Sequence, residues 1–378
     1  MANSRTALVL NGGGARAAYQ VGVLLAIREL LGGRSAANPF PILCGTSAGA
    51  INAAALACHA HDFGAAVATL ATVWRGMHAG DIYRADLPGI SAAGGRWLSA
   101  LAFGWAFRRS PRSLFDNEPL RRLLEARLDM SGIARSLASG ALFAVSITAS
   151  GYATGDSVSF FQAHPEVGRW RRAQRVGCQA ELTVDHLMAS SAIPFIFPAV
   201  YLNREYFGDG SMRQLAPLSP AVHLGAEKVL VVALGQASSG TQRQSSRNYP
   251  TLAQIAGHAL SSIFIDTLSM DVERMERINR TLLHIPDEVR SSRDFGLRPL
   301  QALIITPSER LDDLAARYAH TLPFAVRGLL RMIGAMNRRG GALTSYLLFE
   351  RPFTEALIDL GYRDTMARRE DVGSFLSS

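Results

Sequence analysis

The chain has 378 residues, of which 48% are hydrophobic and 19% are charged, a composition typical of a folded globular protein. Its formal net charge of +8 comes almost entirely from arginine, because Lys228 is the only lysine. Arginine suits phosphate and carboxylate groups, although its abundance can equally reflect genome composition. We expect no nucleic-acid partner, since the sequence has no zinc-finger spacing, RNA-binding aromatic motif or dense basic helix.

The cysteines and the apolar runs also exclude several classes of protein. Cys44, Cys58 and Cys178 are odd in number and lack paired spacing, which argues against a disulfide framework and against a zinc site. The apolar run at residues 7–10 is too short for a signal peptide, and no segment reaches the roughly 18 to 20 apolar residues of a membrane span. We therefore expect a cytoplasmic protein, with peripheral contact to a membrane as an option.

The order of the predicted elements indicates an α/β unit with a parallel sheet. A strand at residues 6–10 and a glycine loop precede a helix at 15–31, which is followed by a strand at 41–44 and a small-residue helix through Ala57. Further strands are expected at residues 142–149, 201–207, 229–233 and 302–305, and further helices at 252–279 and 311–318.

Gly45-Thr46-Ser47-Ala48-Gly49 matches the G-x-S-x-G pattern between a predicted strand and a predicted helix. A serine on such a tight turn lies in strained backbone geometry, and small neighbours such as Gly45 and Gly49 let the turn close. Its hydroxyl then points out at the carboxyl edge of the sheet, beside the N–H groups of a helix start. The pattern favours Ser47 as a nucleophile over an ordinary turn.

The loop Gly12-Gly13-Gly14-Ala15-Arg16 has two interpretations. Gly12, Gly14 and Ala17 fit a dinucleotide fingerprint, but no Asp or Glu lies between Glu29 and Asp62 to hold a ribose. Alternatively, the glycine N–H groups form an oxyanion hole, in which each donor contributes roughly 3 to 4 kcal/mol to transition-state stabilisation. Arg16 either binds a substrate phosphate or braces the loop, and the sequence leaves both roles open.

A serine nucleophile needs a base, and Asp209 is the candidate with the most informative context. It lies in Phe207-Gly208-Asp209-Gly210-Ser211, directly after a predicted strand, although Asp-Gly alone is also a common turn. A Ser-Asp-His order with His223, His258 or His284 is formally available. It is disfavoured because only one strand precedes the elbow and none of these histidines has a distinctive context.

Together these motifs resemble the patatin-like phospholipases. That family combines a Gly-Gly-Gly-x-Arg loop, here Gly12 to Arg16, with a G-x-S-x-G nucleophile and a later Asp-Gly base motif, here Asp209-Gly210. The Ala189-Ser190-Ser191-Ala192-Ile193-Pro194 run is similar to the block that precedes the family's aspartate. Ala17 and Ser211 depart from the usual pattern, but both are small.

The resemblance implies a three-layer α/β/α fold with a mainly parallel central sheet and C-terminal helical additions. It further implies a catalytic domain at residues 1–235 and a C-terminal extension at 236–378, although a single domain remains an alternative. The family hydrolyses acyl esters of phospholipids or other lipids with a Ser–Asp dyad, here Ser47 and Asp209, and without calcium. We expect no metal or other cofactor.

Other functions stay open on the sequence alone. The same dyad could serve a soluble carboxylesterase or thioesterase, or the protein could bind lipid without turnover. The segment at residues 96–109 is apolar and aromatic with arginines at its ends, so it suits either a membrane interface or a buried helix that covers the site. The oligomeric state, headgroup and acyl chain cannot be derived from these motifs.

Overall fold

The computed structural model describes residues 5–33, 37–85, 113–235, 267–286, 289, 296–332, 335–336 and 341–377. The segment at residues 96–109 therefore lies outside the described residues, as does the first part of the helix expected at 252–279. Within the described ranges, no helix combines the length and the apolar character needed to cross a bilayer.

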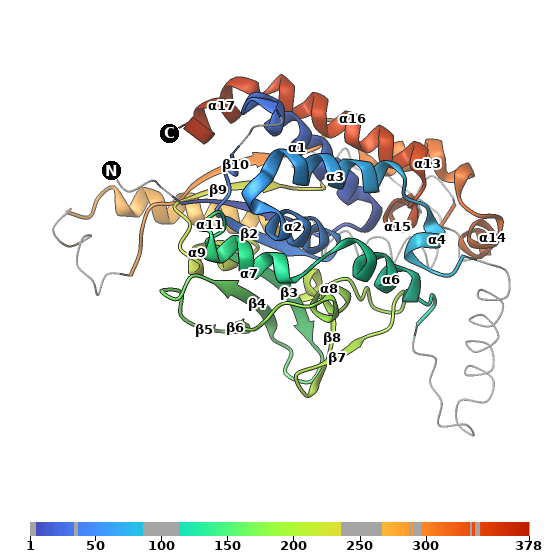
Figure 1. Ribbon diagram of the computed structural model, residues 1–378, viewed down its shortest axis with the longest axis horizontal. Helices are drawn as coiled ribbons and strands as arrows, with labels where there is room; N and C mark the ends of the chain where they lie inside the picture. The colour runs from blue at the N-terminus through green and yellow to red at the C-terminus, as the bar shows by residue number, and fades with distance from the viewer. Residues whose placement is uncertain are drawn as a thin grey trace, which may run out of the picture.

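One mixed sheet forms the centre of the protein (Figure 1). Its described strands are β1 (Thr6–Leu10), β2 (Ile42–Thr46), β3 (Ala144–Gly151), β4 (Ser157–Ala163), β5 (Trp170–Arg172), β6 (Arg175–Gln179), β7 (Val200–Leu202), β8 (Glu205–Asp209), β9 (Lys228–Val232) and β10 (Gln301–Ile305). The strand order is β10-β9-β1-β2-β3-β4-β6-β5, and β8 joins β3 and β7 beside this path. The five strands from β10 to β3 run parallel, whereas β4 and β8 are antiparallel to β3.

Helices cover both faces of the sheet, which gives the three-layer α/β/α arrangement (Figure 1). The described α-helices are α1 (Ala18–Leu30), α2 (Ala48–Cys58), α3 (Phe63–Arg75), α4 (Ala79–Ile82), α6 (Glu118–Arg127), α7 (Ser131–Ala138), α8 (Val184–Ser190), α9 (Ser219–His223), α11 (Thr267–Leu282), α13 (Leu311–Tyr318), α14 (Phe324–Met332), α15 (Gly341–Leu347), α16 (Arg351–Ala367) and α17 (Arg369–Ser377).

Alternate residues of each central strand point to opposite sides of the sheet, because successive side chains of a strand alternate. In β1, Leu8 and Leu10 belong to a large apolar cluster with α1, α2, α3 and α16. Ala7 and Val9 belong to a smaller cluster with α9 and α11 on the other face. Burial on both faces explains why β1 and β9 read as continuous apolar runs.

The fold class predicted from the sequence is confirmed, with one correction to a strand. Residues 201–207 form the hairpin of β7 and β8 and not a single strand. Asn203 and Arg204, with φ values of 50° and 71°, make the turn between them. Two consecutive left-handed residues form the usual two-residue hairpin loop. Glycine is common at the second position of such loops, and because arginine stands there, the sequence did not indicate a turn.

Segments before and after residue 235 share the sheet and the large apolar cluster. β10 pairs in parallel with β9, and α16 lies along α1 (Figure 1). The division at residue 235 stays a prediction. What matters for the site is that α13 and α15 pack beside the short 3-10 helix Gly14–Ala17, which follows β1 and precedes α1.

Candidate active site

Ser47 occupies the turn between β2 and α2 in strained backbone geometry. Its φ of 54° and ψ of −130° lie in a region that non-glycine residues rarely adopt. Small neighbours are required here: a Cβ atom at Gly45 would lie 2.5 Å from the Cα of Ala50, and one at Gly49 would lie 2.2 Å from the carbonyl oxygen of Leu10. The turn therefore closes tightly and packs directly against the end of β1.

The strand register brings Asp209 to this turn. β3 pairs with β2 as far as Thr148 opposite Thr46, and its next residue, Ala149, pairs with Asp209 of β8. Because β2 runs parallel and β8 antiparallel to β3, the two strands meet end to end on the same side of β3. Ser47 and Asp209, separated by 162 positions in the sequence, consequently lie at the same point of the sheet.

The carboxyl of Asp209 is fully buried, and its environment makes it an unusual acid. Oδ1 accepts a hydrogen bond from the Ser211 N–H (2.9 Å). Oδ2 is buried and accepts no hydrogen bond from the described part of the chain. Burial raises the pKa of Asp209 to about 6, and interactions with the Ser47 hydroxyl and with Ser211 oppose this rise. Gly210 is needed beside it, because a Cβ there would lie 2.0 Å from the carbonyl oxygen of Thr148.

The glycine loop ends next to Ser47. Gly12, Gly13 and Gly14 are all buried, and Gly14 lines the same cavity as Ser47. Gly14 has a φ of +55°, and a Cβ atom there would lie 2.3 Å from the carbonyl oxygen of Tyr346. The backbone of the loop is therefore held between the turn at Ser47 and α15.

An apolar cavity extends from Ser47 between α2, α3 and α6. Most of its lining side chains are aliphatic or aromatic. Helix α15 and the loop that follows α8 complete the wall. The residues that line the cavity are Gly14, Ser47, Ala48, Ile51, Ala55, His59, Ala66, Thr69, Leu70, Val73, Trp74, Met77, Ile82, Leu120, Leu123, Leu124, Arg127, Leu128, Ser191, Ile193, Phe197, Tyr346 and Phe349. Such a cavity suits a long hydrocarbon group.

The last residue of α8 and the segment that follows tie the two candidate residues to the sheet. The Ser47 N–H donates to the Ser190 Oγ (2.8 Å), and the Ser190 hydroxyl donates to the carbonyl oxygen of Thr148 (2.6 Å). The Asp209 N–H donates to the carbonyl oxygen of Ala192 (2.9 Å). In the sequence this segment stands out only by its resemblance to the family, and no pattern there indicates that Ser190 holds the turn.

A protein-family model for patatin-like phospholipases matches residues 8–222, more than half of the chain. The chain belongs to the patatin-like phospholipase family. A search of curated protein sequences finds no match. Among solved structures, the crystal structure of VipD from Legionella pneumophila is similar over 97% of this chain and 67% of that chain, with 12% sequence identity and a TM-score of 0.36.

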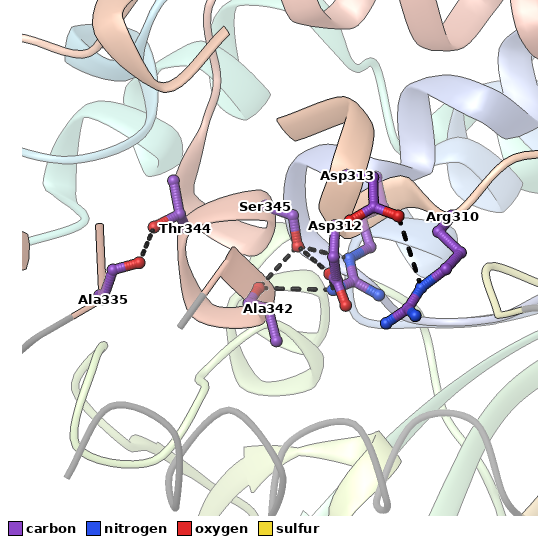
Figure 2. A network of polar contacts seen from close by, with 8 residues as sticks. Arg310, Asp312, Asp313, Ala335, Ala342, Thr344 and Ser345 are labelled. Carbon is purple, nitrogen blue, oxygen red and sulfur yellow. Dashed lines mark hydrogen bonds and ion pairs between the residues drawn. The ribbon is translucent and has the colours of Figure 1, made fainter. Parts of the chain in front are cut away.

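Residues beyond the matched range, among them Asp312, Ala342 and Ser345, form a network of polar contacts (Figure 2). The Arg16 side chain is only 3% exposed and pairs with Asp312 of α13. Its Nε donates to the Ser345 Oγ (2.8 Å), and its guanidinium lies 4.1 Å from the centre of the Tyr346 ring. Ser345 also donates to the carbonyl oxygen of Ala342 (2.6 Å). Arg16 thus joins the end of the glycine loop to α13 and α15.

A buried chain of amides holds the other side of the loop. Gln20 Nε2 donates to the carbonyl oxygen of Asn11 (2.7 Å), Asn52 Nδ2 donates to Gln20 Oε1 (2.8 Å), and Trp74 Nε1 donates to Asn52 Oδ1 (2.9 Å). The chain joins the start of the glycine loop to α1, α2 and α3. Sequence analysis missed it, because isolated Asn and Gln residues in apolar helices carry no pattern of their own.

The described histidines do not surround Ser47. His223 stacks on Trp170 at 4.9 Å beside the smaller apolar cluster, His284 follows α11, and His258 lies outside the described residues. His59 lines the cavity, but at the end of α2 that is remote from Ser47. Within the described ranges, no three carboxylate, imidazole or thiol groups gather closely enough to hold a metal ion.

Proposed function

We propose that the protein hydrolyses carboxylic esters of lipids, of the phospholipase A or lysophospholipase type, with Ser47 as nucleophile and Asp209 as base. The observation that supports this most strongly is the meeting of the two residues at one end of an apolar cavity. A strained serine turn, a buried carboxyl with a raised pKa and a hydrocarbon-sized cavity serve no common structural purpose. All three suit acyl transfer from a lipid.

In the proposed first step, Asp209 accepts the hydroxyl proton while Ser47 Oγ attacks the ester carbonyl. The N–H groups of Gly12, Gly13 and Gly14 stabilise the negative charge that develops on the carbonyl oxygen. When the tetrahedral intermediate collapses, the alcohol leaves and takes the proton from Asp209. In the second step, Asp209 accepts a proton from a water molecule as the water oxygen attacks the acyl carbonyl. The bond from the acyl carbon to Ser47 Oγ then breaks, Asp209 returns the proton to Ser47 Oγ, and the fatty acid leaves.

The environment of Asp209 supports its role as base. A carboxylate is ordinarily too weak a base for a serine hydroxyl, but a pKa of about 6 makes this one stronger while leaving it ionised at neutral pH. We assign Arg16 to positioning of the glycine loop, because its guanidinium already pairs with Asp312 and Ser345. Binding of a substrate phosphate by Arg16 would require those contacts to break.

The test is fatty-acid release from phospholipid vesicles and from monomeric lysophospholipid, with calcium chelated. We expect release by the wild type and a loss of at least 1,000-fold in Ser47→Ala, as removal of a serine nucleophile generally causes. Ser269→Ala, an exposed serine of α11 across the sheet, is the matched control and should retain full activity. Activity on small soluble esters or thioesters alone would favour the esterase, and lipid binding without release would contradict hydrolysis.

A further inference from the structure

The cavity follows one face of α2 along the whole length of that helix. Ala48, Ile51 and Ala55 line it at spacings of three and four residues, which places them on one side of the helix. Ser47 precedes the first residue of α2 and His59 follows the last. The cavity thus begins at the candidate nucleophile and ends where α2 ends.

The helix gives the cavity a measurable length. Twelve residues from Ser47 to His59, at 1.5 Å each, span about 18 Å. An extended chain of tetrahedral atoms advances about 1.2 Å per bond, by analogy with the three bonds of an extended peptide residue. The path therefore accommodates about 15 bonds, which corresponds to an acyl chain of about 14 carbons attached at Ser47.

Three residues at the far end of the cavity also line a second pocket. His59, Arg127 and Leu128 belong to both, and the second pocket is otherwise walled mainly by polar residues around the end of α6 and the start of α7. Arg127 is exposed and Leu128 is half-buried. These three side chains therefore separate an apolar interior from a polar, outward-facing pocket.

We propose that this partition sets the length of the substrate's acyl chain, an inference that rests on the proposed ester hydrolysis. The cavity encloses linear acyl chains of up to about 14 carbons. The end of a longer chain would contact Leu128. An apolar chain gains affinity from each methylene it buries, and it gains nothing from a polar pocket beyond the partition. The preferred substrate class is therefore a lipid ester with one straight chain of this length.

The test measures binding without turnover. Ser47→Ala protein is titrated with monomeric lysophosphatidylcholines of 8 to 18 acyl carbons, and tryptophan fluorescence follows binding because Trp74 lines the cavity. We expect the affinity to rise about fourfold per added methylene up to about 14 carbons, and then to level off. A rise that continues through 18 carbons at the same slope would overturn the proposal.

Two further variants, each added to Ser47→Ala, locate the limit. Ala55→Leu blocks the path about 12 Å from Ser47, at about 1.5 Å per residue, so the levelling should move to about 9 carbons. Leu128→Ala removes the side chain at which the acyl chain ends, so the levelling should move to chains a few carbons longer than about 14. If Ala55→Leu does not fold, Thr69→Ile narrows the same cavity from α3.

Arg122→Ala, on the exposed side of α6, is the matched control and should leave the limit unchanged. An equal loss of affinity at every chain length in Ala55→Leu would contradict a length limit along α2. Failure of the proposed hydrolysis is a different result, namely no fatty acid released by the wild type. It leaves the binding series interpretable, because that series needs no reaction.

Discussion

The burial of Asp209 makes a prediction about stability that is independent of any substrate. A carboxyl whose pKa is raised in the folded protein is easier to protonate there than in the unfolded chain. Its ionisation therefore costs folding free energy. Replacing Asp209 with Asn removes the charge while retaining an oxygen that can accept the hydrogen bond from the Ser211 N–H.

The size and the pH window of the effect follow from the pKa values. A folded-state pKa of about 6, against an ordinary value of 3.8, corresponds to about 3 kcal/mol at about 1.36 kcal/mol per pH unit. Below pH 3.8 the carboxyl is protonated in both states and costs nothing. The penalty develops as the pH rises towards 6 and is complete above it. Asp209→Asn should therefore be up to about 3 kcal/mol more stable than the wild type at pH 8.

Urea unfolding at pH 8, 6 and 4, followed by tryptophan fluorescence, measures this difference. The gain in Asp209→Asn should be largest at pH 8 and should nearly vanish at pH 4, although the variant hydrolyses no lipid. Ser47→Ala is the matched control, since it loses the nucleophile but retains the ionisable carboxyl. A variant that is no more stable than the wild type at pH 8, or equally stabilised at every pH, would refute the reasoning.

Three further predictions concern activity. The kcat/KM of the wild type should fall about tenfold per pH unit below about pH 6 as Asp209 is protonated, and an acidic limb centred near pH 4 would contradict this assignment. Asp312→Asn weakens the contact that holds Arg16 beside the glycine loop, so it should lower kcat about tenfold or more with little change in KM. The control is Asp313→Asn, an exposed neighbour that pairs with Arg310, and it should leave kcat unchanged. Equal effects of the two substitutions would argue against a positioning role for Arg16. Gly14→Ala should lower kcat about 100-fold, because the added Cβ would lie 2.3 Å from a backbone oxygen. Gly80 has open space around it, so Gly80→Ala should leave kcat unchanged. A Gly14→Ala enzyme with normal kcat would show that the glycine loop takes no part in the mechanism.

Local glycine geometry explains why much of the fold around the site could be predicted from the sequence. At Gly49 and Gly210 a Cβ atom would lie within 2.2 Å of a backbone oxygen, so only glycine fits there. Glycine at these positions of the two motifs therefore indicates where the backbone passes close to another segment. Strands with both faces buried, such as β1 and β9, appear as uninterrupted apolar runs. The hairpin of β7 and β8 was not predicted, because its turn uses Arg204 in a left-handed conformation.

The partners of the site residues could not be predicted, because they are distant in the sequence. Arg16 meets Asp312 across 296 positions and Ser345 across 329. Ser190 holds the Ser47 N–H across 143 positions. Such contacts depend on how α13, α15 and α8 pack against the sheet, and packing leaves no local pattern. The cavity depends likewise on the mutual placement of α2, α3 and α6.

The most direct test of Ser47 as the nucleophile is covalent labelling by a long-chain alkyl fluorophosphonate, followed by peptide mass spectrometry. The mechanism predicts one adduct, on the peptide that contains Ser47, which forms rapidly in the wild type, slowly in Asp209→Asn and not at all in Ser47→Ala. Labelling of a different residue, or equal labelling of Ser47→Ala and the wild type, would contradict the assignment of Ser47.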